Sequence, residues 1–353
     1  MNKPIFTWIW GNCHIQGIAV DKENGYIYYS FTTKLIKARL DGEIVGTVDG
    51  LAGHLGCIAF NEKDGCVYGS LEYKNDIIGK GILNALNSKA SFDDSFYVAK
   101  FDVTKIDRIG KSAEKNNIMT AMYLKEATDD YNGKGFDKEG NTVLHKYGCS
   151  GIDGLTFAPL PGEADKGPDY LYVAYGIYDD TNRNDNNHQI LLCYSINECS
   201  KYFTAFNQKN MHKAGPSAPL HKYFVYTGNT RYGVQNLEYD KHTKALFMSV
   251  YRGHKDGFPN YSLFAADCEK PATFEFSAEI NEKAEMLKLK KYGEYDEKSK
   301  TYGWHFPYGA TGLFSYGDGN WLISHNRETP EGQCSYIHYY KWNKDNFFEC
   351  ITE

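Results

Sequence analysis

The sequence predicts an all-β fold, a five-bladed β-propeller of four-stranded antiparallel blades, on three observations. The 353 residues include 29 Tyr, 20 Phe and 34 Gly, a composition that favours strands and tight turns. One pattern occurs five times along the chain: a polar residue, an aliphatic strand, a turn and an aromatic strand. Two further strand-like stretches follow each copy. Four strands in each of five units is typical of a propeller.

Each copy of the pattern predicts a hairpin, because its turn carries residues that tolerate positive φ. The hairpins are expected over residues 16–30, 56–70, 153–174, 235–249 and 311–324. The third and fourth strands of the blades are expected at 35–40 and 43–48, 96–101 and 118–123, 190–194 and 222–226, 262–266 and 285–289, and 336–340 and 347–351.

The copies begin at irregular intervals, with equivalent positions 40, 97, 82 and 76 residues apart. Propellers with inserted loops vary in this way, and the longest interval leaves room for a sixth blade, which is the alternative architecture. We expect one domain over residues 1–353, with insertions near 75–95, 125–146 and 207–221. The first insertion contains one expected helical turn at Ile82–Leu86. Ile5–Trp10 can close the ring as an outer strand, a place for which Phe347–Ile351 competes.

The first copy reads Gly17-Ile18-Ala19-Val20-Asp21, with Gly25 and Tyr28 following at fixed spacing. It resembles the repeats of NHL-type and related β-propellers, and the resemblance extends more loosely over all five units. What the resemblance implies is a fold. The same architecture serves hydrolases, lyases, lectins and scaffolds, so no activity is implied.

The net charge and the cysteine content indicate which classes of partner and which cellular compartment to expect. Thirty-nine Lys and Arg against 45 Asp and Glu give a net charge of −6, so no overall field attracts nucleic acid or an anionic membrane. No apolar stretch approaches the roughly 20 residues that span a bilayer. Nine Cys without a CxxC pair indicate reduced, mostly buried thiols and a cytoplasmic protein, with a secreted mature form as the alternative. The expected partner is a small-molecule substrate.

The inner strands of a propeller line a central channel, so the residues that open them are expected to meet at one face. These residues are Gln16, Gly56, Asp153, Gln235 and Thr311. Neighbouring loops add candidate substrate-binding residues, namely Arg231, Tyr308, Arg252, His254, His325 and Arg327. Glu72 and Lys74 lie in the same set of loops, without an assigned role. A mouth rich in Arg and His favours an anionic ligand such as a carboxylate, uronate or phosphate. The alternative is that these loops are simply polar.

Four residues are candidates for catalysis, namely Asp153, His14, His54 and Tyr232. Asp153 is the one acidic side chain in the opening ring, where burial would raise its pKa and suit it to general acid or base catalysis. The alternative is a carboxylate that links blades through backbone N–H groups. Tyr232 and Tyr308 occupy equivalent positions and could stack on a sugar or donate a proton, or else pack between blades.

His14 and His54 occupy equivalent positions in neighbouring blades, so their side chains are expected to be close. They could move protons, or hold a divalent metal together with Gln16, Asp153 or His325. The alternative is that both histidines bond to loop carbonyls.

Two further features leave alternatives open. Glu238 lies in a column of packed inner-strand residues and needs either a basic partner or a carboxylate pair with Asp153, as in glycosidases. The polar stretch 179–187 could hold Ca²⁺ or be a solvated loop.

These residues predict a hydrolase or lyase that acts on a small anionic or carbohydrate-like substrate in one axial pocket, with metal assistance as an option. The alternative is a non-catalytic ligand-binding or scaffolding propeller.

Overall fold

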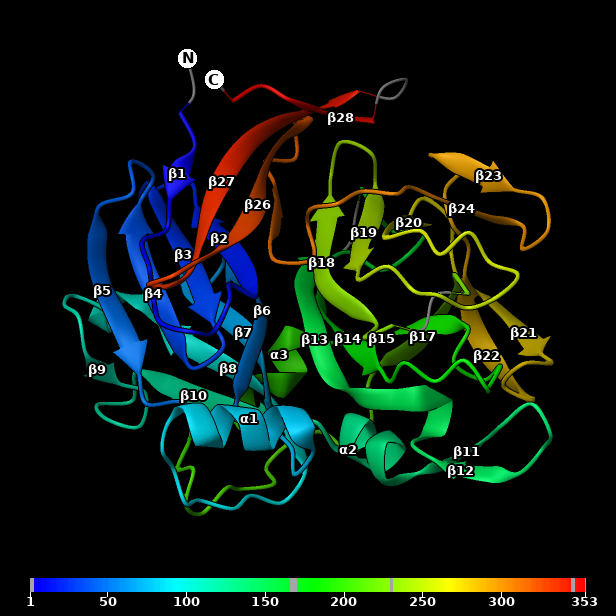
Figure 1. Cartoon of the computed structure of the whole chain (residues 1–353), viewed down its shortest axis with the longest axis horizontal. Helices are drawn as coiled ribbons and strands as arrows, with labels where there is room; N and C mark the ends of the chain where they lie inside the picture. Colours follow the sequence, from blue (N-terminus) through cyan, green and yellow to red (C-terminus); the bar gives the residue numbers. More distant parts are fainter. Residues whose placement is uncertain (1–2, 166–169, 229–230, 344–346, 353) are drawn as a thin grey trace.

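The computed structural model describes residues 3–165, 170–228, 231–343 and 347–352. Five of its sheets are arranged around a central axis as blades (Figure 1), and two further sheets have two strands each. The innermost strands are β2 (Gly17–Asp21), β6 (His54–Asn61), β13 (Cys149–Ala158), β18 (Val234–Asp240) and β25 (Leu313–Ser315). Each touches the next, and β25 touches β2, so the ring is closed. The predicted five-bladed propeller is confirmed, and the six-bladed alternative is not.

The first three blades contain the predicted hairpins and outer strands. Blade 1 continues with β3 (Tyr26–Phe31), β4 (Lys34–Arg39), β5 (Ile44–Asp49) and β9 (Lys111–Ser112). Blade 2 continues with β7 (Cys66–Tyr73), β8 (Ser95–Asp102), β10 (Met119–Tyr123) and β16 (Thr204–Ala205). Blade 3 continues with β14 (Tyr170–Ile177), β15 (His188–Tyr194), β17 (His221–Tyr226), β22 (Glu282–Leu287) and β21 (Thr273–Ser277).

Blade 4 differs from the prediction. It consists of β18, β19 (Ala245–Val250) and β20 (Leu263–Asp267). The prediction that residues 285–289 form the fourth strand of blade 4 is wrong, because β22 instead pairs in parallel with β17 of blade 3. There Glu285 faces His221 at 2.8 Å and Met286 packs on the blade-3 core. The stretch meets blade 4 just beyond β22, in a single bridge between Leu289 and Ala266.

Both candidates for ring closure take part in blade 5. This blade contains β25, β26 (Asn320–Thr329) and β27 (Gly332–Asn343). The N-terminal β1 (Ile5–Phe6) pairs with β27 at Ile337 and Tyr336, and β28 (Phe347–Cys350) pairs with it further along, at Tyr340 to Asn343. The N-terminal β1 therefore closes the ring by joining the last blade, and β28 pairs along the same edge of β27.

The remaining elements lie in the segments that connect the strands of the blades. The stretch 75–95 contains α1 (Ile77–Ala85), a full helix where a single turn at Ile82–Leu86 was expected. The stretch 125–146 contains α2 (Lys125–Asn132) and the hairpin β11 (Lys134–Phe136) and β12 (Thr142–Leu144). Elsewhere are α3 (Ile196–Cys199), β23 (Glu294–Asp296), β24 (Thr301–Gly303) and short 3₁₀ turns at 103–105, 146–148 and 200–202. Among the described helices, none is both long and apolar enough to cross a membrane.

The core lies between neighbouring blades and is strongly aromatic. Tyr28, Tyr68, Tyr172 and Trp321 are almost completely buried. Each comes from the second strand of its blade, so the aromatic half of the repeated pattern fills the space between sheets. This packing holds the inner strands rigidly around the axis.

Candidate functional site

The face at which the inner strands begin contains a cavity of about 530 Å³, bounded by blades 1 to 4 and by α1. We call it the axial pocket. It brings together several predicted site residues, namely His14, Gln16, His54, Asp153, Tyr232 and Gln235. The expectation that separate inner strands direct their first polar side chains toward one another therefore describes this pocket well.

A second cavity of about 480 Å³ adjoins the first and shares His14 and Tyr251 with it. We call it the side pocket. It contains three further predicted residues, Arg252, Tyr308 and Thr311. Arg252 forms no ion pair with any residue that the structure describes, so its charge is available to a ligand.

The other predicted basic residues line neither cavity. Arg231 Nε and His254 Nδ1 lie 3.9 and 3.4 Å from the carboxylate of Asp179, which offsets the charge of Arg231. His325 stacks between Tyr308 and His338, with ring centroids 3.5 and 3.9 Å away.

The other two predicted basic residues, His325 and Arg327 of blade 5, add no positive charge to the pockets. Burial, with His338 and Arg327 nearby, lowers the pKa of His325 to about 4, so its ring is neutral at physiological pH. Arg327 lies over the ring of Tyr336. Of the predicted Arg residues, Arg252 is therefore the one that lines a described pocket.

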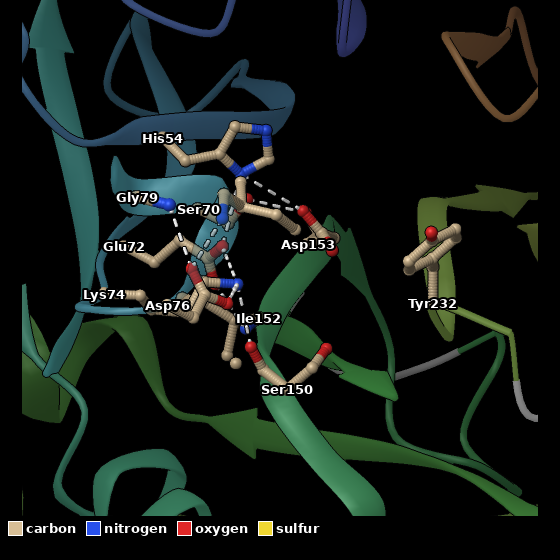
Figure 2. A network of polar contacts seen from close by, with 12 residues as sticks. His54, Ser70, Glu72, Lys74, Asp76, Gly79, Ser150, Ile152, Asp153 and Tyr232 are labelled. Atoms are coloured by element: carbon tan, nitrogen blue, oxygen red, sulfur yellow. Dashed lines mark hydrogen bonds and ion pairs between the residues drawn. The ribbon is translucent and has the colours of Figure 1, made fainter. Parts of the chain in front are cut away.

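Four ionisable side chains meet on one side of the axial pocket, and we call them the axial cluster: His54, Glu72, Lys74 and Asp153 (Figure 2). His54 Nδ1 lies 3.4 Å from Glu72 Oε1 and 3.5 Å from Asp153 Oδ1. Lys74 Nζ lies 2.6 Å from Glu72 Oε1. The side chains of Glu72 and Lys74 are 2% and 4% exposed, so this ion pair is buried.

The backbone of β13 fixes the cluster. Its pairing with β14 shifts register between Ile152 and Leu155, and such bulges redirect side chains next to functional sites. The N–H of Ile152 donates to Glu72 Oε2 at 3.1 Å, and Lys74 Nζ donates to the carbonyl of Ser150 at 2.9 Å. Asp153 Oδ2 accepts a hydrogen bond from Gln235 Nε2 at 3.1 Å, which ties blade 3 to blade 4.

Glycine leaves the room that these carboxylates need. A Cβ on Gly56 would lie 2.5 Å from Ser70 Oγ and 3.2 Å from Asp153 Oδ1. One on Gly176 would lie 2.5 Å from Ser150 Oγ and 3.2 Å from Asp153 Oδ2. A Cβ on Gly151 would lie 2.2 Å from Glu72 Oε2, and Gly151 has φ of +120°. Glycine at these three positions therefore leaves space for the side chains of Glu72 and Asp153.

Replacing Gly151 with Ala is expected to destabilise the fold by about 2–4 kcal/mol, because the new methyl group overlaps the Glu72 carboxylate and the backbone is strained. Urea denaturation measures this loss. Gly110→Ala is the matched control, since Gly110 also has positive φ but has no atom within 4 Å of the position that a Cβ would take. Equal losses in the two variants would show that the contact with Glu72 does not matter.

The environment separates the pKa values of the two carboxylates. Burial raises the pKa of Asp153 to about 7, with the negative charge of Glu72 adding to the effect and His54, Lys74 and Gln235 opposing it. Burial also acts to raise the pKa of Glu72, but Lys74 and His54 outweigh it and the net shift is downward. Two carboxylates whose pKa values diverge in this way are typical of acid–base sites.

His54 is oriented like a catalytic base. Burial disfavours the imidazolium, but Glu72 and Asp153 outweigh it and raise the pKa of His54. In the neutral ring, the two carboxylates beside Nδ1 favour the tautomer that carries its proton on Nδ1, which leaves the lone pair on Nε2. Nε2 points away from both carboxylates (Figure 2) and bonds to no residue that the structure describes. A carboxylate thus holds an imidazole whose other nitrogen can accept a proton.

His14 is not part of this cluster. Its Nδ1 lies 2.8 Å from the carbonyl oxygen of Ile15, and burial lowers its pKa. It lines both pockets as a neutral ring, so the alternative of a histidine bonded to a loop carbonyl describes it.

The donor set can be tested against the predicted metal. Ligand atoms of His54, Glu72 and Asp153 lie within 4.8 Å of one another, which suits a divalent cation by donor type. However, the ammonium of Lys74 already lies against Glu72 at 2.6 Å and is itself buried. A second cation would meet this charge directly. With Lys74 present, the site fits an ammonium rather than a metal ion, and His14 lies outside the set.

Glu238 does not form the carboxylate pair considered from the sequence. It lines neither pocket. Its Oε1 accepts from the N–H of Ser315 at 2.8 Å, and its Oε2 accepts from Thr156 Oγ1 at 3.2 Å. It therefore links blades 3, 4 and 5. No ion pair connects it to a basic side chain among the described residues.

The polar stretch 179–187 also has a built-in cation. Nζ of Lys255 donates to the carbonyl of Arg183 at 2.5 Å and to Asn186 Oδ1 at 3.0 Å, and also contacts Asn187. Lys255 is 2% exposed. The ammonium of Lys255 thus binds the oxygen atoms that could have been ligands of the predicted Ca²⁺.

Comparison with known proteins gives no family. No family model matches the chain, and no curated protein sequence matches it. Similar solved structures include a GH43 β-1,3-galactosidase with galactodeoxynojirimycin, at TM-score 0.44 and 10% identity over 98% of this chain and 97% of that one. A luciferin-regenerating enzyme matches at TM-score 0.38 and 9% identity over 96% and 80%. A gluconolactonase from Xanthomonas campestris matches at TM-score 0.35 and 9% identity over 96% and 95%. Likeness at this level carries no argument about function.

Proposed function

We propose that the protein is an enzyme, a hydrolase or lyase, that moves protons on a small polar substrate held in the axial pocket. The observation that carries the proposal is the axial cluster. It combines an imidazole held through Nδ1 by carboxylates, with Nε2 free, and a neighbouring carboxyl whose pKa is about 7. The Asp153 carboxyl can therefore exchange a proton near neutral pH, where general acid–base catalysis is most effective, and an imidazole is the commonest general base.

In hydrolysis, His54 Nε2 takes a proton from water as the water oxygen bonds to the electrophilic carbon. The bond from that carbon to the leaving oxygen breaks, and the proton of Asp153 passes to this oxygen. In elimination, His54 takes a proton from carbon, a double bond forms, and Asp153 again protonates the leaving oxygen. Each route removes one proton and delivers one, and exchange with solvent resets the pair.

The placement of the carboxylates supports a proton-transfer pair over a glycosidase with two flanking carboxylates. Of the described acidic side chains, Glu72 and Asp153 line the axial pocket, and both lie beside His54 Nδ1. Two carboxylates on the same side cannot flank a glycosidic bond. The proposed reaction therefore relies on His54 for the base.

A carbohydrate-like or carboxylate-bearing substrate suits the rest of the site. Tyr232 and Tyr251 meet edge to face with ring centroids 5.7 Å apart, and both line the axial pocket, so they offer an aromatic surface to a sugar ring. Gln16 and Gln235 supply amides for hydroxyl groups. An anionic group reaching the side pocket would meet Arg252.

Asp153→Asn and His54→Gln are each expected to lower turnover by roughly 10²–10⁴-fold without unfolding the protein. The assay uses a panel of esters, lactones and uronate-containing oligosaccharides, preceded by a thermal-shift screen of uronates, phosphates and neutral sugars. Glu238→Gln is the matched control, because it makes the same carboxylate-to-amide change in the inner-strand column but outside both pockets. Its turnover should match that of the unaltered protein.

Full turnover in Asp153→Asn and His54→Gln would contradict the proposal. Ligand binding that is preserved in both variants, with no turnover of any panel member by the unaltered protein, would instead support a non-catalytic binding propeller.

A further inference from the structure

We infer that the substrate carries a short alkyl or aryl substituent next to its reacting centre, and that α1 binds this substituent. The inference rests on the proposed function, because it concerns the same axial pocket. It names a feature of the substrate that the polar residues of the propeller axis do not indicate.

The side of the pocket formed by α1 is apolar. The residues of α1 that line the cavity are Ile78, Gly81, Ile82 and Ala85. They follow the i, i+3, i+4, i+7 spacing of a single helix face, so all four belong to one stripe directed at the cavity. No side chain in this stripe can form a hydrogen bond.

The helix is held in place before any ligand arrives. The Asp76 carboxylate caps its first turn by accepting from the N–H groups of Ile78 and Gly79 at 3.0 and 2.9 Å. A Cβ on Gly79 would lie 1.8 Å from the carbonyl oxygen of Lys74, so only glycine lets the helix approach this closely. Asp76 also lies 3.6 Å from Lys74 Nζ, which links the cap to the axial cluster. The apolar side is therefore preformed and fixed relative to the catalytic groups.

The two sides of the pocket make different demands on a ligand. The axial cluster and Gln235 require polar groups, whereas hydroxyl groups placed against Ile78 and Ile82 would lose their bonds to water and gain none. A volume of about 530 Å³ accommodates a small molecule with both parts. The small residues Gly81 and Ala85 leave space beside the isoleucines for the substituent.

The test measures the affinity of 1-alkanols from ethanol to hexanol by ligand-observed NMR titration. These probes carry one hydroxyl and a growing chain, so they report the apolar side without requiring turnover. Affinity should rise with chain length by up to about fourfold per methylene. Ile78→Asn should remove most of this rise.

Ile77→Asn is the matched control, because it makes the same change one residue away at a side chain that is 87% exposed and does not line the pocket. It should leave the rise intact. Ile78 is itself 39% exposed, so its substitution should not prevent folding, and Ala85→Asn gives a second exposed position at which the rise should weaken.

An affinity that does not rise with chain length, no binding at all, or a rise that persists in Ile78→Asn would overturn the inference. Each of these results leaves the proposed function standing if Asp153→Asn still abolishes turnover. Conversely, loss of the proposed function would appear as unchanged turnover in Asp153→Asn, whatever the alkanols do.

Discussion

Replacing Lys74 with Met should destabilise the fold by about 3–5 kcal/mol, because it leaves the Glu72 carboxylate buried without its cation. Met preserves most of the chain length but removes the ammonium that contacts Glu72 at 2.6 Å and the carbonyl of Ser150 at 2.9 Å. Glu72 is 2% exposed and cannot regain water without local unfolding. The free energy of unfolding, measured by urea denaturation, should fall accordingly.

A double variant separates this electrostatic cause from lost packing. Adding Glu72→Gln removes the stranded charge, so the double variant should be more stable than the sum of the two single effects implies. A second measurement uses Zn²⁺ or Mn²⁺. Without the ammonium, the donor atoms of His54, Glu72 and Asp153 become free to bind a cation, so either metal should raise the melting temperature of Lys74→Met.

The unaltered protein should show no such metal effect. If it does, and if His54→Gln removes the effect, then a metal binds beside Lys74 and the ammonium does not exclude it. Equal stability of Lys74→Met and the unaltered protein would show that the buried ion pair contributes nothing net.

The fold was predictable because its signals are local. In four of the five hairpins the strand residues and the positive-φ turn lie within about 15 residues of each other, so the pattern alone marks β2–β3 or β18–β19. Pairing between strands that lie far apart in the sequence was not predictable in this way. Residues 285–289 were correctly seen as strand-like, but β22 joins β17 of blade 3, where Glu285 meets His221. Nothing in the local pattern distinguishes that edge from the edge of β20.

The site was predictable to the extent that the inner strands define it. Their opening positions placed Gln16, Asp153 and Gln235 together, because a closed ring leaves them no other direction. The positions of loop side chains were less predictable, because they depend on the length of the loop and on the residues that each side chain contacts. Arg231 and His254 lie beside Asp179 and line neither pocket.

Glu72 and Lys74 were visible as loop residues but were assigned no role. A signal was available: side chains two residues apart at the end of a strand share a face, so a Glu-x-Lys sequence beside the expected axis can form an ion pair there. The apolar side contributed by α1 gave no such signal, because the helix lies in an insertion that has no counterpart in the repeated pattern.

Glu238 should make the protein less stable as the pH rises from about 4.5 to 8. Burial raises the pKa of Glu238 from its ordinary 4.5 to about 8, against the hydrogen bonds from Ser315 and Thr156 that act to lower it. Below pH 4.5 the carboxyl is protonated in both the folded and the unfolded chain, so it has no effect. Between these pH values the unfolded chain releases the proton and the folded chain keeps it. The free energy of unfolding therefore falls by roughly 1.4 kcal/mol per pH unit from this group.

Glu238→Gln removes the titrating group and keeps the side-chain shape. The free energy of unfolding of the variant, minus that of the unaltered protein, should increase with pH and level off above pH 8, after a total change of about 4–5 kcal/mol. Urea denaturation at half-unit steps from pH 4.5 to 8.5 measures it. Asp153 is present in both proteins, so its own titration cancels.

Glu23→Gln, at an exposed carboxylate, controls for the substitution itself and should give a much flatter difference. A difference for Glu238→Gln that falls with rising pH would mean that the folded protein holds an ionised Glu238. Its link between blades 3, 4 and 5 would then be charged, and a basic partner would have to lie within reach.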